Sequence, residues 1–93
     1  MDEYGSRLEE ISKPGTIVRH FKREIDNEGK NYLYEIIGIG HHSETNEDMM
    51  VYRALYEPYR MCVRPLPMFM SEVDREKYPD IRQKYRFEVY HGD

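Results

Sequence analysis

Five short runs rich in β-branched and aromatic residues, separated by turn-forming residues, constrain the fold of this chain most strongly. They cover residues 16–22, 32–40, 49–56, 60–64 and 84–90. Runs of this length, bounded by Gly, Pro, Asn and Asp, are typical of β-strands. The last run, KYRFEVY, alternates most clearly, with Tyr85, Phe87 and Val89 on one face. We expect that face to lie on the core.

The pattern predicts a mainly β fold, which we expect to be a small SH3-like antiparallel β-barrel of about five strands with one short helical turn. Gly38 and Gly40 lie late in the second run and favour a bulge or a sharp bend, as at the corner of a barrel. Pro65 and Pro67 end strand pairing, and residues 68–73 are predicted to form the helical turn. Closing the sheet into a barrel would remove its exposed edges.

The length of the chain, 93 residues, predicts a single domain. We expect residues 1–13 to form an N-terminal arm and residues 14–93 to form one β-barrel domain, because the Lys-Pro-Gly sequence at the boundary interrupts regular structure. A domain of this size buries roughly 60–70% of its surface. It can hold one small core and no large enclosed cavity, so we expect any ligand to bind in a groove or on a loop surface.

Charge and cysteine content weigh against several classes of function. The formal net charge is −4, and non-specific nucleic-acid binding depends on Lys and Arg contacts to phosphate, so nucleic acid is not the favoured partner. Cys62 is the only cysteine, which fits a reducing cytosol. Residues 1–15 resemble no signal peptide, and no apolar run approaches the ~20 residues of a membrane span. We therefore expect a cytoplasmic protein with no membrane partner.

The polar connector HHSETNED, residues 41–48, carries side chains that metal sites and active sites use. Neighbouring residues in an extended segment point to opposite faces, so His41 and His42 are poorly placed to share a metal ion. The usual zinc-ligand spacings are absent, and we expect neither a metal nor a cofactor. Ser43 has no strand–turn–helix context of the kind that presents a nucleophile, and no catalytic residue is assigned.

Two interpretations of the connector remain. The side chains of Ser43, Glu44 and Thr45 can accept hydrogen bonds from nearby backbone N–H groups and stabilise a tight turn, or they can contact a ligand. An enzyme with His42 as general base, a hydrolase or a nucleotide-processing enzyme, is the alternative class, because histidine titrates near neutral pH. It requires His42 to face a cleft with a second polar group within hydrogen-bonding reach.

Three arginines, Arg19, Arg53 and Arg64, lie inside strand-like runs rather than in charged loops. Each must reach solvent or pair with a carboxylate through its planar guanidinium group. Glu44 is the partner that we expect for Arg53, since the connector directly precedes that strand. These arginines form either a structural ion-pair network or, together with histidines of the same region, an anion-binding patch.

Tyrosine is unusually frequent, with nine residues, and tryptophan is absent. Five tyrosines within the predicted strands are candidates for the core, which such rings most often fill. A small barrel can also present aromatic rings in a groove that grips an extended peptide or a methylated cation. The sequence leaves both roles open. The five are Tyr32, Tyr34, Tyr52, Tyr56 and Tyr85.

Four ordered motifs, VRHFK, YEIIGIGHHSET, VYRALY and VRPLPMF, resemble the DUF1653 family of small bacterial, archaeal and fungal proteins of unknown function. The resemblance covers Pro14 to about Val73. Three positions depart from the family pattern: Val18 replaces an aromatic residue, Gly40 replaces Ala and Cys62 replaces Trp. The resemblance implies a compact β fold and carries no established activity.

The sequence thus favours a non-catalytic binding module that recognises a small anionic ligand or a partner protein. The alternatives are the enzyme that uses His42 and an RNA-binding barrel, in which Lys22 and Arg60 would join the strand arginines on one face. The predicted ligand-binding residues are Arg19, His20, His42, Ser43, Glu44, Thr45, Tyr52, Arg53 and Arg64.

Overall fold

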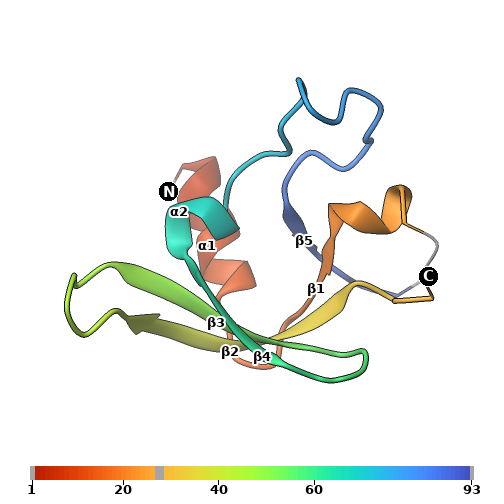
Figure 1. Ribbon diagram of the computed structural model, residues 1–93. Coiled ribbons are helices and arrows are strands. Elements are labelled where there is room, and N and C mark those ends of the chain that lie inside the picture. The colour runs from red at the N-terminus through yellow and green to blue at the C-terminus, as the bar shows by residue number, and fades with distance from the viewer. Residues whose placement is uncertain (1, 27–28, 93) are drawn as a thin grey trace.

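An antiparallel sheet of five strands carries the fold in the computed structural model, which describes residues 2–26 and 29–92 (Figure 1). Along the sheet the strands run in the order β4-β3-β2-β1-β5. The mainly β class predicted from the sequence is therefore confirmed. The strands are β1 Ile17–His20, β2 Leu33–His41, β3 Asp48–Ala54, β4 Met61–Pro65 and β5 Phe87–Val89.

The sheet is open rather than closed. β4 and β5 form its two edges and do not pair with each other within the described part of the chain. The hydrogen-bonded closure expected of a barrel is thus not observed. The predicted bulge is present: the register between β2 and β3 shifts between Ile36 and Gly38, where two residues of β2 face one of β3.

In the described part of the chain, three short helices accompany the sheet: α1 Glu3–Ile11, the 3-10 helix η1 Phe21–Glu24 and the one-turn helix α2 Leu66–Phe69. α2 begins two residues before the predicted turn, because proline is tolerated in the first turn of a helix. The sequence prediction of a single helical turn omitted η1 and the full length of α1. Residues 3–11 of the expected N-terminal arm form α1.

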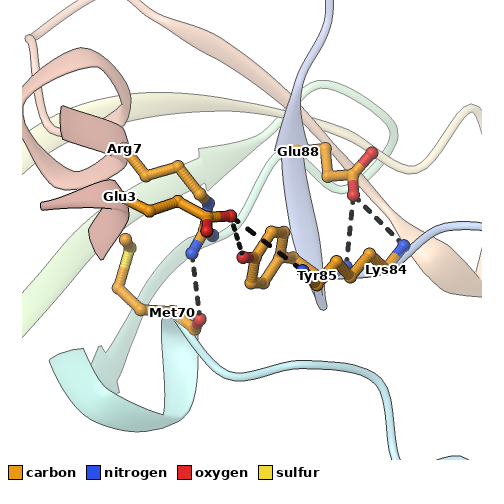
Figure 2. Close-up of polar contacts among 6 residues, drawn as sticks. All are labelled: Glu3, Arg7, Met70, Lys84, Tyr85 and Glu88. Atoms are coloured by element: carbon orange, nitrogen blue, oxygen red, sulfur yellow. Dashed lines mark hydrogen bonds and ion pairs between the residues drawn. The ribbon is translucent and has the colours of Figure 1, made fainter.

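Side-chain contacts attach α1 to Tyr85, which precedes β5, and to Met70, which follows α2 (Figure 2). Tyr85 Oη donates a hydrogen bond to Glu3 Oε1 at 2.9 Å, and Arg7 lies 3.5 Å over the Tyr85 ring. Arg7 Nη1 also donates to the carbonyl of Met70 at 3.4 Å. At its other end α1 inserts Ile11, which is 2% exposed, into the main core. The helix is therefore part of the domain's packing.

The main core lies on the inner face of the sheet, because alternate residues of each strand point there. Val18, Ile36 and Met50 are completely buried on this face. Phe69 from α2 stacks on Phe87 from β5 with ring centroids 4.2 Å apart and planes 9° apart. This contact joins the helix that follows one edge strand to the other edge strand.

A second, smaller cluster stabilises the long connection between α2 and β5, and Glu24 ties it to η1. The Glu24 carboxylate accepts hydrogen bonds from the backbone N–H groups of Arg82 at 2.9 Å and Gln83 at 2.8 Å. Burial alone would raise the pKa of Glu24. The two N–H donors and the charges of Arg23 and Arg82 outweigh burial and lower this pKa. The cluster itself consists of Phe21, Val73 and Ile81, with Tyr78 packed against it.

Replacing Glu24 with glutamine should lower the free energy of unfolding by about 1–3 kcal/mol, because the amide cannot accept both backbone hydrogen bonds as the carboxylate does. Urea denaturation at neutral pH measures the loss. The Glu76→Gln variant is the matched control, since Glu76 is exposed in the same connection. Because the Glu24 pKa is lowered on folding, its contribution is present above the pKa of the unfolded chain and is lost on acidification. Equal stability of the two variants would contradict this role.

Candidate functional site

A cleft of about 390 Å³ opens on the inner face of the sheet, where β1 ends and β2 begins. We call it the tyrosine cleft. It receives side chains from all five strands, from η1 and the connection between η1 and β2, and from the turn that follows β3. Its lining residues are His20, Lys22, Asp26, Lys30, Tyr32, Tyr34, Tyr52, Tyr56, Cys62, Arg64 and Phe87.

The floor of the cleft is an aromatic cluster. Tyr34 packs edge-on against Tyr52, with ring centroids 5.4 Å apart, and both contact Phe87. All three rings are buried. Tyr56, which is half-buried, leans on Tyr34 at 5.6 Å and on Tyr32 at 5.9 Å. Each ring of the floor therefore packs against at least one other ring.

The tyrosine hydroxyls form short polar contacts above this floor. The hydroxyls of Tyr34 and Tyr56 lie 2.5 Å apart, and Tyr52 Oη accepts a hydrogen bond from Arg64 Nε at 3.2 Å. Tyr32 donates to the Asp26 carboxylate. Burial raises the pKa of Tyr34 and that of Tyr52. Both hydroxyls therefore keep their protons at neutral pH.

Positive charge predominates in the lining. Lys22, Lys30 and Arg64 are cationic, whereas Asp26 is the one carboxylate among the described lining residues. Arg64 is half-buried, and in residues 2–26 and 29–92 no carboxylate lies within ion-pair distance of it. Its guanidinium carbon also lies 5.8 Å from the centre of the Phe87 ring. An arginine held between aromatic groups without a carboxylate is well suited to bind an anion.

His20 lines the cleft with an imidazole ring that is uncharged at neutral pH. It is 7% exposed, and its Nδ1 accepts a hydrogen bond from the backbone N–H of Lys22 at 3.1 Å. Burial is the main reason that the pKa of His20 is lowered to about 3. The positive charges of Arg64, Arg86 and Lys22 act in the same direction. At neutral pH the imidazole thus adds no charge to the cleft.

Of the predicted ligand-binding residues, the structure brings His20, Tyr52 and Arg64 together in this cleft. Arg19 lies elsewhere, with its guanidinium carbon 4.2 Å from the centre of the Tyr90 ring, beside a different cleft that Gln83 also lines.

The expected ion pair between Glu44 and Arg53 is wrong. Arg53 Nη2 binds Glu35 Oε1 at 2.8 Å instead. Glu35 and Arg53 face each other in the register of β2 and β3. Arg53 is exposed, and because it follows Tyr52 directly in β3 it projects from the opposite face of the sheet. The ion pair therefore lies outside the tyrosine cleft.

The connector between β2 and β3 is a hydrogen-bonded hairpin turn. His42 Nδ1 accepts from the backbone N–H groups of Glu44 at 3.2 Å and Thr45 at 3.3 Å. Thr45 Oγ1 accepts from the N–H of Glu47 at 3.2 Å, and Ser43 is exposed in the turn. His42 is also exposed and does not line the tyrosine cleft. These contacts are those of a structural turn.

Several lining residues are not among the ligand-binding residues predicted from the sequence. Lys30 and Asp26 lie in a segment that the sequence presents as a solvated turn, and Tyr34 and Tyr56 had both a core and a groove interpretation. The strand alternation places Tyr34 on the same face as Ile36, which is a usable signal for the inner face. No local signal brings the turn residues over that face, because their position depends on how η1 folds back.

Within residues 2–26 and 29–92, no three His, Cys, Asp or Glu side chains gather in an arrangement that could hold a metal ion. No helix in this part of the protein is both long enough and apolar enough to cross a bilayer.

Comparison with known proteins identifies one family. A family model described as "Protein of unknown function (DUF1653)" matches residues 16–89, which include all five strands. No curated protein and no solved structure matches the chain.

The buried, neutral state of His20 makes stability depend on pH. Its pKa in the folded protein, about 3, lies below the value near 6.5 of the unfolded chain. The stability that neutral His20 contributes is therefore complete above pH 6.5 and is lost as the pH falls towards 3. At pH 5 the imidazole is protonated in the unfolded chain but not in the folded protein. This difference alone should lower the free energy of unfolding by about 2 kcal/mol relative to neutral pH.

Urea denaturation at pH 7 and pH 5 tests this expectation. From pH 7 to pH 5, the free energy of unfolding of the His20→Gln variant should fall by about 2 kcal/mol less than that of the unmodified protein. This difference does not depend on how stable the variant is at pH 7. His41→Gln, which changes an exposed histidine at the end of β2, is the matched control. If the free energy of unfolding falls by the same amount in His20→Gln as in the unmodified protein, the lowered pKa of His20 is wrong.

Proposed function

The chain belongs to the DUF1653 family of proteins of unknown function, and we propose that it is a non-catalytic binding module whose tyrosine cleft takes a small anion. The observation that carries the proposal is the state of Arg64. This half-buried cation has a tyrosine hydroxyl for a partner and no carboxylate within ion-pair distance in residues 2–26 and 29–92.

Arg64 is oriented for binding before a ligand arrives. Its Nε donates to Tyr52 Oη at 3.2 Å, and the buried ring of Tyr52 is fixed by its contacts with Tyr34 and Phe87. The remaining guanidinium nitrogens are available to an anion, to which arginine binds with two parallel hydrogen bonds. Because the side chain is pre-organised, less conformational entropy is lost on binding.

The surroundings strengthen this interaction. The aromatic floor excludes water from one side of the cleft, and electrostatic attraction is stronger where the effective dielectric constant is lower. Lys22 adds a further positive charge at the end of β1. Small-molecule sites typically combine an apolar lining with a few convergent polar groups in a volume of about 300–1,000 Å³. The tyrosine cleft fits that description.

We also propose that the sheet is an open variant of the SH3-like barrel. Two features support this assignment: β1 lies between β2 and β5 in the sheet, and the helical turn α2 precedes β5. In place of hydrogen bonds between the edge strands, the stacked rings of Phe69 and Phe87 bridge the gap.

Anion binding should raise the melting temperature. At an anion concentration tenfold above its dissociation constant, binding to the folded state stabilises the protein by about 1.4 kcal/mol, which is a shift of several degrees for a domain of this size. The Arg64→Gln variant should lose this shift for inorganic phosphate and for benzoate. Thermal denaturation followed by circular dichroism measures both effects.

Arg53→Gln is the matched control, because Arg53 is also a strand arginine but is paired with Glu35 on the opposite face. This variant should keep the full anion-induced shift. The Arg64→Lys variant separates binding from folding, since it retains the charge and should keep part of the shift. If Arg64→Gln responds to anions as the unmodified protein does, or if both Arg64 variants fail to fold, the proposed site is wrong.

A further inference from the structure

The proposed function leaves the class of anion open, and the lining of the cleft narrows it. We infer that the tyrosine cleft is built for a phosphate monoester carried on a flat aromatic or heteroaromatic ring. This inference rests on the proposed function and adds two requirements: a doubly charged head group and a planar body.

The charge balance of the lining argues for a doubly charged head group. Two cationic side chains of the lining, Arg64 and Lys22, have no carboxylate within ion-pair distance among the described residues, so the cleft offers two positive charges to a ligand. His20 does not change this balance at neutral pH, because it is neutral there. A phosphate monoester carries about −1.5 to −2 charges at pH 7. A carboxylate or a sulfate ester carries one and would leave the cleft with uncompensated positive charge.

The positions of the cations suit a group with several acceptor oxygens. Arg64 reaches the cleft from β4, whereas Lys22 reaches it from η1, beyond the end of β1. β2 and β3 lie between these elements in the sheet, so the charges approach from two sides of the aromatic floor. A phosphate group presents three strong acceptor oxygens and can accept hydrogen bonds from more than one direction.

The aromatic rings account for the planar body. Tyr56 stands half-buried at the margin of the floor, tilted by 50° to Tyr32 and nearly perpendicular to Tyr34. A flat ring inserted beside Tyr56 would gain stacking or edge contacts, which are worth about 0.5–1.5 kcal/mol beyond the area that they bury. Its edge would also meet the paired hydroxyls of Tyr34 and Tyr56. An inorganic anion would use none of these contacts.

Asp26 limits the site to a single phosphate group. Its carboxylate lines the cleft and accepts a hydrogen bond from the Tyr32 hydroxyl. A second phosphate placed on that side would approach a negative charge. The cleft thus suits a monophosphate better than a di- or triphosphate.

Four small compounds test the inference on the full chain: phenyl phosphate, phenyl sulfate, inorganic phosphate and phenol. Isothermal titration calorimetry at pH 7.5 gives their dissociation constants. Phenyl phosphate should bind at least tenfold more tightly than phenyl sulfate, which has nearly the same shape but one charge fewer. It should also bind at least tenfold more tightly than inorganic phosphate, which lacks the ring, and phenol should bind most weakly.

The outcomes distinguish this inference from the proposed function. Equal affinity for phenyl phosphate and phenyl sulfate would overturn the doubly charged head group, and equal affinity for phenyl phosphate and inorganic phosphate would overturn the planar body. In both cases anion binding at Arg64 would stand. If none of the three anions binds, the proposed function fails with it.

Lys22→Gln provides an independent test within the protein. Lys22 is exposed, and its backbone N–H rather than its ammonium group makes the bond to His20, so the fold should not depend on the charge. The variant should bind phenyl phosphate about fivefold more weakly and phenyl sulfate nearly as well as the unmodified protein does. Lys13→Gln, an exposed change outside the cleft, should alter neither. Equal weakening of both ligands by Lys22→Gln would contradict the charge argument.

Discussion

The stacking of Phe69 on Phe87 is the contact on which the rest of this structure depends. β4 and β5 are the two edges of the sheet, and no strand hydrogen bonds join them in the described residues 2–26 and 29–92. Phe69 follows β4 and Phe87 lies in β5, and their rings stack with centroids 4.2 Å apart. Phe87 also contacts Tyr34 and Tyr52. Phe87 thus joins the two edges of the sheet by side-chain packing. The tyrosine cleft lies beside this ring, where the edges stay open.

The abundance of tyrosine follows from this arrangement. A ring that forms both the core and the floor of a cleft needs an apolar body and a polar tip, and tyrosine has both. Tyr34 and Tyr52 bury their rings against Phe87, whereas their hydroxyls meet Tyr56 and Arg64. The same side chains therefore stabilise the fold and shape the candidate site. A change in one of these rings would affect folding and binding together, which is why the proposed tests alter the charged residues.

Strand composition and alternation were sufficient to predict the five strands and the bulge near Gly38, since both depend on local sequence. The structure does not bring all of the predicted site residues together. It combined Tyr52 with Arg53, although adjacent residues in a strand point to opposite faces, so the alternation already argued against that pairing. The partner of Arg53 is Glu35, which is opposite in the register of two strands and not adjacent in sequence. Lys30 and Asp26 were missed because only the tertiary fold brings that turn over the inner face.

The distribution of charge bears on the choice between a small ligand and a nucleic acid. The chain carries a formal net charge of −4, yet the described lining of the tyrosine cleft is positive. The residues outside the cleft lining must therefore carry a larger net negative charge than the chain as a whole. A nucleic acid contacts a broad surface through many phosphates and would meet this negative charge, whereas a small anion can enter the cleft and contact its cations alone. This contrast in charge supports the proposal of a small ligand, because the cleft would attract an anion whereas the acidic remainder of the surface would repel a large polyanion.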